Sequence, residues 1–231
     1  MKFGRGGRSQ VEPEIVADSD EVELEDGDEV VDELDADVPA EFGDEVDWRA
    51  DGPFDYEEVD LGTDVPRIDL DTLILTPWDG LNLQLQVDEQ SRRVLAVTGV
   101  WAESGLEVVL FAAPGTAGMA DELREEAIAE AAELSGTTEV TDGPFGPQIQ
   151  RVLPQPGPTG EQLFHVSRVW FVEGPKWLLR GTLLGEAALP DAPESKAAPF
   201  VEFFRNLVVR RGNQPLVPGD RITMNLPEGA G

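Results

Sequence analysis

The clearest alternation of apolar and polar residues along the chain is at 81–88, where the sequence reads LNLQLQVD. Its apolar residues occupy every second position, which is typical of a strand with one buried face. Three other apolar runs of strand length lie nearby: RIDLDTLILTP (67–77), RVLAVTGVWA (93–102) and LEVVLFAAP (106–114). Because consecutive strands with short links pair as neighbours, these runs predict an antiparallel meander.

A helical period of apolar residues follows in the stretch GMADELREEAIAEAAELSG, at 118–136. The residues of its apolar face are Met119, Leu123, Ala127, Ala131 and Leu134. Acidic residues gather in the N-terminal half, where the helix dipole favours them. Gly136 is placed to end the helix as its C′ residue. The pattern predicts an amphipathic helix with a solvated acidic face.

The remaining apolar segments predict more strands and a second helix. The segment at 143–154 is a turn and a strand, and 162–185 is a hairpin around Glu173-Gly174-Pro175. The segment SKAAPFVEFFRNL (195–207) is a helix with Pro199 in its first turn, where a missing N–H costs nothing. A short strand, LVVRRG, and a Pro-rich surface strap complete the chain. The order predicts an α+β domain with an antiparallel sheet of six or seven strands and two packed helices.

Charge divides the chain into two parts. The net charge is −30, and residues 1–60 hold 23 acidic and 4 basic residues against 24 and 13 in 61–231. Between 11 and 60, acids recur every second or third residue and only single apolar residues separate them. Such a segment cannot bury enough apolar surface to offset its ordering entropy, which predicts a disordered acidic arm over 1–60. The α+β domain is then expected at 61–231, with the Pro-rich strap at its C-terminal end.

The arm has two interpretations, a solubilising tail or an acidic-hydrophobic segment that docks on a basic protein. Its end, from Trp48 to Tyr56, is richest in aromatic residues and could lie against the domain or a partner. The large negative charge disfavours direct binding to nucleic acid or to an anionic membrane. No run of about eighteen apolar residues is present, so no transmembrane helix is expected. The N-terminus lacks the apolar stretch of a secretory signal, and the absence of cysteine is compatible with the cytoplasm.

Catalytic and metal-binding patterns are weak. The single histidine, His165, shares a strand face with Ser167, but no nucleophile elbow or oxyanion loop accompanies the pair. His165 is therefore expected on the sheet surface. The acidic arm lacks the ligand spacing of a calcium loop, and the Gly-rich N-terminus has neither the strand nor the helix of a phosphate cradle. We expect no catalytic residue, no metal site and no cofactor.

The hairpin at 164–184 holds the candidate binding residues: Arg168, Trp170, Lys176, Trp177 and Arg180. Strand alternation puts Lys176 and Arg180 on one face and Trp177 on the other, in the core. Arg168 is expected opposite the two cations, with Trp170 nearby. Such a cationic face could hold a phosphate or an acidic peptide, including the acidic arm itself. Alternatively, the cations pair across the strands with acids such as Glu173.

Several motifs resemble an actinobacterial domain-of-unknown-function family, DUF3710, over about residues 52–227. They are GPFDYEEVD, RIDLDTLILTP, FAAPGTAGMADELRE, GPFGPQIQRVLP, VEGPKWLLRG and LVVRRGNQPLVPGDRITMNLP. Pro175-Lys176-Trp177 stands where Pro-Arg-Trp is expected for the family, and Gly118-Met119-Ala120 where Gly-Leu-Trp is usual. A lysine there weakens the case for an essential bidentate contact. The resemblance implies a cytoplasmic protein and brings no activity or cofactor.

The element order more loosely resembles the Mog1/PsbP-like fold, whose members bind other proteins and are not enzymes. A non-catalytic, cytoplasmic protein-interaction or regulatory module is thus the expected function, with another protein as partner. One alternative is a small-molecule or nucleotide-binding domain that uses the cationic-aromatic hairpin. Another is an acidic arm that mimics nucleic acid and binds a basic partner. Oligomeric state and the identity of the partner stay open.

Overall fold

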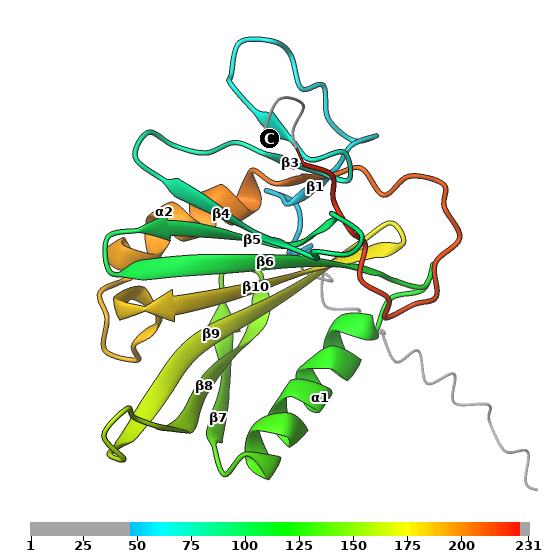
Figure 1. The fold of residues 1–231 in the computed structure, drawn as a ribbon. Coiled ribbons are helices and arrows are strands. Elements are labelled where there is room, and N and C mark those ends of the chain that lie inside the picture. The colour runs from blue at the N-terminus through cyan, green and yellow to red at the C-terminus, as the bar shows by residue number, and fades with distance from the viewer. Residues whose placement is uncertain (1–46, 227–231) are drawn as a thin grey trace, which may run out of the picture. The chain divides into compact units, whose positions relative to one another are not determined.

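The computed structural model describes residues 47–226, and Figure 1 shows how they fold. Residues 1–46 and 227–231 are outside the described part. Most of the predicted acidic arm therefore lies outside it. No helix among residues 47–226 is long and apolar enough to cross a membrane.

A seven-stranded antiparallel sheet is the centre of the fold, in the order β4-β5-β6-β10-β9-β8-β7. Its strands are β4 (Asn82–Val87), β5 (Val94–Trp101), β6 (Ser104–Ala112), β7 (Thr137–Gly143), β8 (Gly146–Pro156), β9 (Gln162–Gly174) and β10 (Trp177–Gly185). Two meanders, β4–β6 and β7–β10, join through the β6–β10 pair, in which Leu110 lies opposite Leu179. The predicted α+β class and antiparallel sheet are confirmed.

The edge strand β7 is absent from the sequence prediction. Its residues, TTEVTDG, are mostly polar and exposed or half-exposed. An edge strand needs partners on one side only, and polar side chains there oppose pairing with another chain. Because β7 is mostly polar, it has no apolar run by which the sequence could predict it.

A second, smaller sheet has the order β1-β11-β3-β2. Its strands are β1 (Phe54–Asp55), β2 (Ile68–Asp69), β3 (Leu73–Leu75) and β11 (Val208–Val209). The single strand predicted at 67–77 is wrong, because the chain turns back at Asp71, whose φ is 73°. The Asp71 N–H bonds the side chain of Asp69 at 2.8 Å, a local turn bond that competes with an extended backbone.

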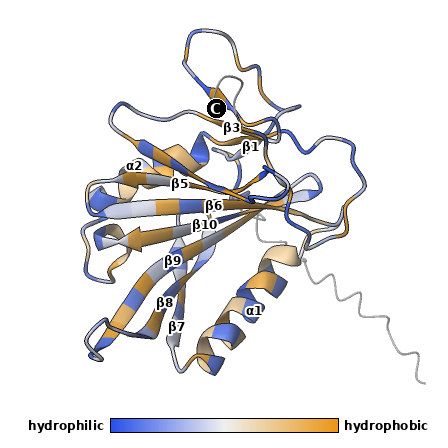
Figure 2. Cartoon of the chain, viewed as in Figure 1, coloured by the Kyte–Doolittle hydropathy of each residue, from blue (hydrophilic) through white to orange (hydrophobic). Residues whose placement is uncertain are grey.

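The two helices cover opposite faces of the large sheet. Helix α2 (Glu194–Arg205) buries Phe200 and Phe204 in one core with alternate residues of β10, among them Trp177. Helix α1 (Met119–Glu133) packs against the other face, with Leu178 of β10 in its core. Figure 2 shows apolar and polar residues alternating around both helices. Both predicted helices are confirmed.

The end of α1 differs from the prediction in one residue. Ser135, not Gly136, takes the left-handed conformation, with φ of 59°. The N–H of Gly136 bonds the Ala131 carbonyl at 2.8 Å and that of Ser135 bonds the Ala132 carbonyl at 3.0 Å, which is the Schellman arrangement. Gly136 is needed for space, because a Cβ there would lie 2.8 Å from the backbone carbonyl oxygen of Val152.

Replacing Ser135 by glycine is therefore expected to stabilise the domain by about 1 kcal/mol, since glycine adopts a positive φ without steric cost. Urea unfolding of Ser135→Gly should show a higher midpoint than the wild type. Gly136→Ala is the contrasting variant and should lower the midpoint. An unchanged or lower midpoint for Ser135→Gly would contradict the strain at this position.

Helix α2 begins one residue before the predicted segment. Its first residue is Glu194, which places Pro199 at the sixth position, inside the helix. The prediction of Pro199 in the first turn is therefore wrong. Ion pairs of Glu194 with Arg168 and of Lys196 with Glu186 connect the first turn to neighbouring elements. These partners lie on other elements, so the local sequence pattern does not reveal them.

Candidate functional site

The candidate hairpin residues do not form one site. Arg168 lies opposite Leu183 of β10, whereas Arg180 lies opposite Phe171 of β9. Leu183 belongs to the core under α2 and Phe171 to the core under α1, so Arg168 and Arg180 point to opposite faces of the sheet. The expectation that Arg168 faces Lys176 and Arg180 is wrong. The register depends on the turn at Pro175-Lys176, where Lys176 has φ of 60° and is not part of either strand.

Trp177 is a core residue, as its strand position predicts. Its side chain is fully buried, and its indole N–H donates a hydrogen bond to Oδ2 of Asp55 at 2.7 Å. The guanidinium of Arg49 lies 5.7 Å from the centre of the ring. The neighbouring Lys176 is exposed, and its carbonyl accepts a bond from Nε of Arg211 at 3.1 Å. Contacts with Asp55, Arg49 and Arg211 therefore hold this end of the hairpin.

Asp55 brings the segment before residue 61 into the folded structure. Phe54 and Asp55 form β1, which pairs in parallel with β11, and Asp55 is only 8% exposed. Arg49 donates hydrogen bonds of 2.5 and 2.7 Å to the carboxylate of Glu58. These bonds hold the pKa of Glu58 below its ordinary value. Residues 49–58 thus form a closed turn against the domain.

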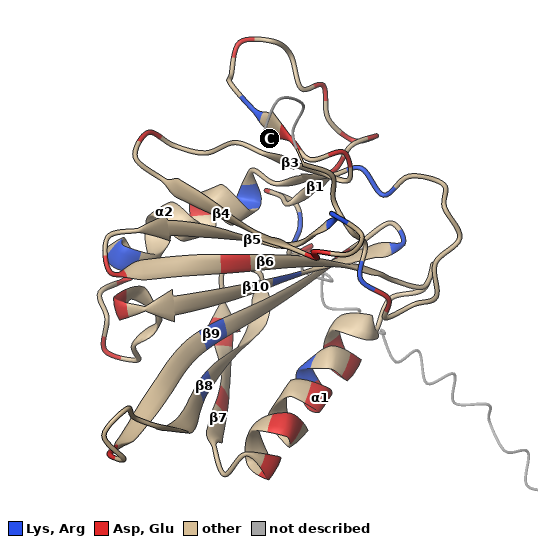
Figure 3. Ribbon diagram, in the orientation of Figure 1, with Lys and Arg blue, Asp and Glu red and all other residues tan. Residues whose placement is uncertain are grey.

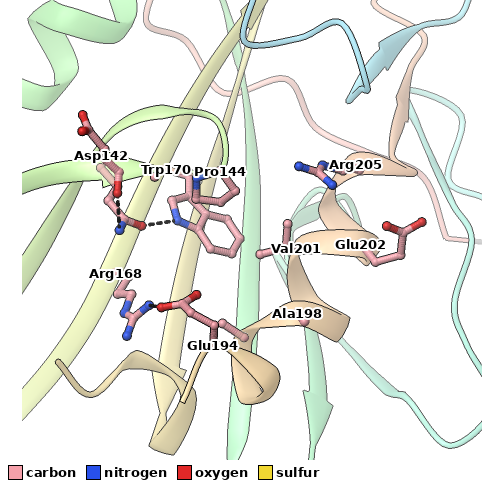
Figure 4. A pocket seen from close by; sticks show the side chains of 12 residues that line it. Asp142, Pro144, Arg168, Trp170, Glu194, Ala198, Val201, Glu202 and Arg205 are labelled. Carbon is pink, nitrogen blue, oxygen red and sulfur yellow. Dashed lines mark hydrogen bonds and ion pairs between the residues drawn. The ribbon is translucent and has the colours of Figure 1, made fainter. Parts of the chain in front are cut away.

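Arg168 and Trp170 line a cavity of about 470 Å³ between α2 and the β7–β8 hairpin, which we call the α2 groove (Figure 4). Val201, Ala197 and Pro144 supply its apolar lining. Its other lining residues are Asp142, Gly143, Gln148, Glu194, Ala198, Glu202 and Arg205. Residues from the β7–β8 hairpin, from β9 and from α2 therefore meet here.

Hydrogen bonds hold the indole of Trp170 in the groove. Its N–H donates to Oε1 of Gln148 at 2.8 Å (Figure 4). The amide of Gln148 in turn donates to the hydroxyl of Thr141 at 3.2 Å and to the carbonyl of Asp142 at 3.3 Å. Trp170 itself is 2% exposed and packs edge-on against Phe204. The network links the wall of the groove to the β7–β8 hairpin.

Arg168 is a buried cation with partners. It is 7% exposed, and its guanidinium bonds Oε1 of Glu194 at 3.3 Å and the carbonyl of Leu189 at 2.7 Å. Glu194 is the first residue of α2, where the helix dipole favours a negative charge. The alternative that the cations pair across the strands with acids such as Glu173 does not describe Arg168, because its carboxylate partner, Glu194, belongs to α2. Glu173 instead accepts bonds from the N–H groups of Gly118 and Ala120 at the start of α1.

Comparison with known proteins gives the family. The family described as "Protein of unknown function (DUF3710)" matches residues 52–231. The chain belongs to this family. The DUF3710 match begins at Gly52, just before β1. The resemblance seen in the sequence motifs is confirmed.

Other comparisons add little to the DUF3710 assignment. The search of curated proteins returned no match. A similar solved structure is the solution structure of cyanobacterial PsbP (CyanoP) from Synechocystis sp. PCC 6803, at 11% sequence identity and a TM-score of 0.35. That similarity covers 66% of this chain and 96% of the cyanobacterial one.

The His165–Ser167 pair lies on β9 of this DUF3710 domain. His165 is exposed, as expected, whereas Ser167 is fully buried and accepts a bond from Nε of Arg151 at 3.3 Å. Within residues 47–226, no group of three or more His, Asp or Glu side chains is placed to hold a metal ion. The groove residues Gln148 and Glu194 are not among the sequence candidates. Their contacts with Trp170 and Arg168 reveal them.

Proposed function

We propose that the DUF3710 domain of this chain is a non-catalytic, cytoplasmic protein-interaction module whose α2 groove receives a basic segment of its partner. The observation that carries this proposal is the combination of an apolar lining with an acidic rim. Pro144, Ala198 and Val201 offer a surface for an apolar side chain, with the buried ring of Trp170 behind them. The carboxylates of Asp142 and Glu202 stand at its edge.

Charge supports a basic partner. The Arg168 cation is engaged by Glu194, which leaves Asp142 and Glu202 against the single cation Arg205 in the groove. The whole chain carries a net charge of −30, and acidic residues recur along its surface elements (Figure 3). A field of this sign attracts positively charged partners and raises their rate of association.

The exposure of the carboxylates supports recognition of a charged partner. Asp142, Glu194 and Glu202 are all exposed. The groove thus offers accessible negative charge to a basic segment.

The test is selection of peptides from a random library displayed on phage, with the full-length chain as bait. Ala198→Trp fills the groove from an exposed position on α2, so the core is not disturbed. Ala132→Trp is the matched control, an exposed alanine on α1. We expect selected peptides to carry an apolar residue flanked by lysine or arginine. Their affinity should fall about tenfold or more with Ala198→Trp and stay within about twofold with Ala132→Trp.

Other outcomes would overturn the proposal. Peptides that bind Ala198→Trp as tightly as the wild type do not use the groove. Peptides without basic residues would contradict the role of the acidic rim. The remaining alternative is that the acidic arm binds the basic partner, and a chain without residues 1–46 tests it. If basic peptides lose affinity for this shorter chain but bind Ala198→Trp as tightly as the wild type, the acidic arm is the binding element.

A further inference from the structure

A second cavity, of about 710 Å³, lies between α1 and the large sheet, on the face away from α2. Phe111, Phe171, Leu123 and Ala127 give it apolar walls. Arg180 of β10 and Arg221 from the C-terminal strap bring two cations to it. We call it the α1 cavity. It shares no lining residue with the α2 groove and does not depend on the function proposed for that groove.

Arg180 is the unusual group in the α1 cavity. Its Nε is buried and has no hydrogen-bond partner among the described residues. The carboxylate oxygen of Glu107 is 3.7 Å from its NH2 group, beyond hydrogen-bonding distance. A guanidinium carries five N–H donors, and buried donors are nearly always paired in folded proteins. The Nε itself has almost no accessible surface, but the terminal NH groups of Arg180 also donate no hydrogen bond among residues 47–226, and these are the donors that a ligand can reach.

Arg168 provides an internal comparison. It is the more deeply buried of the two arginines, with 9% of its side chain exposed against 32% for Arg180. Yet Arg168 bonds both a carboxylate and a carbonyl. The buried guanidinium of Arg168, which holds α2 to the sheet, thus has hydrogen-bond partners, unlike that of Arg180. Burial lowers the pKa of Arg180. The nearby cations Arg221 and Arg151 lower this pKa further, whereas the charge of Glu107 raises it.

The surroundings of Arg180 limit the kind of ligand. The side of its guanidinium lies over the ring of Phe111, 5.5 Å from the ring centre, so polar and apolar contacts are available together. Glu126, Glu130 and Glu133 of α1 also line the cavity. Their charges oppose any anion, and they oppose most strongly one with two or more negative charges, such as phosphate. The charge of Glu130 is offset by Arg151, 3.8 Å away. A single carboxylate on an apolar body satisfies Arg180 and fills the walls with the least repulsion.

We propose that the α1 cavity binds a small monocarboxylate with an apolar body, whose carboxylate accepts hydrogen bonds from Arg180 and Arg221. The apolar body packs between Leu123 and Ala127 of α1 and Phe171 of β9. No reaction is involved. The ligand leaves the cavity as it entered.

The experiment is calorimetric titration of the full-length chain with octanoate and with 3-phenylpropionate, and with inorganic phosphate and octanol as comparators. Arg180→Gln removes the charge and keeps much of the length of the side chain. Arg221→Gln does the same at an exposed position, where loss of folding is not a concern. Arg92→Gln is the matched control, an exposed arginine in the turn between β4 and β5.

We expect at least one carboxylate to bind, and its affinity to fall about tenfold or more in Arg180→Gln, since a hydrogen bond to a charged group is lost. Arg221→Gln should weaken binding by a smaller factor, and Arg92→Gln should leave it unchanged. Octanol and phosphate should bind more weakly than octanoate. The proposal is overturned if neither carboxylate binds. It is also overturned if Arg180→Gln and Arg221→Gln bind the carboxylate as tightly as the wild type does, or if phosphate binds more tightly than octanoate.

Discussion

A chain that begins at residue 61 is expected to be less stable than one that begins at residue 47 by roughly 3–5 kcal/mol. The shorter chain loses β1, whose Phe54 N–H bonds the Leu207 carbonyl at 2.9 Å. It also leaves the buried indole N–H of Trp177 without its partner, Asp55. An unpaired buried donor alone costs about 1–3 kcal/mol. Urea unfolding followed by tryptophan fluorescence measures the difference.

Single substitutions locate the effect within the segment. Asp55→Ala should cost about 1–3 kcal/mol, because it removes the acceptor of the Trp177 N–H. Asp51→Ala removes an exposed carboxylate of the same segment and should leave the midpoint nearly unchanged. Equal midpoints for the chains that begin at 47 and 61 would show that residues 47–60 contribute nothing to the fold. An acidic-arm deletion intended to spare the domain should therefore end at residue 46.

The second large effect is expected from Glu194→Ala, which should lower the free energy of unfolding by about 1–2 kcal/mol, because Arg168 is buried whereas Glu194 is exposed. The substitution leaves the guanidinium of Arg168, 7% exposed, without its counter-charge. Arg168→Met replaces the buried cation by an apolar side chain of similar length and should cost less, about 1 kcal/mol. The asymmetry follows because a buried charge without a partner is worse than no charge.

A double-mutant cycle tests this explanation. In the Arg168→Met background, Glu194→Ala should cost well under 1 kcal/mol, since only the helix-dipole contribution of Glu194 remains. Equal costs of Glu194→Ala in both backgrounds would contradict a coupling between the two residues. Both variants keep Ala198, so their peptide affinity can be compared with that of the groove-filling variant.

The sequence predicts those parts of the fold whose signal is local. Alternation at 81–88 gives β4, and the period of α1 gives most of its packed face, because each pattern lies within one element. Leu134 is the exception, since it follows the helix and is exposed. It fails where a distant partner decides. Strand β1 lies within the acidic run and is held by β11 and Trp177, and neither partner is visible from the local composition.

The candidate site shows the same division. Alternation puts Trp177 correctly in the core, and it places Arg180 correctly on the other face of β10. The face of Arg168 relative to Arg180 requires the register across the hairpin, which the turn at Lys176 sets. The carboxylate partner of Arg168 comes from α2, a separate element. Pairing across elements is therefore what the sequence alone does not provide.

The β6–β10 pair has a consequence for the order of events during synthesis. Strand β6 is made early, but its neighbour β10 leaves the ribosome only after α1, β7, β8 and β9. Each meander can close locally, whereas joining them requires closing a long loop, which is slow. Until then Leu110 and Val108 of β6 lie along an open apolar edge. Docking of the two halves should thus limit the rate of folding, and a nascent chain that stops before β10 should be the form most in need of a chaperone.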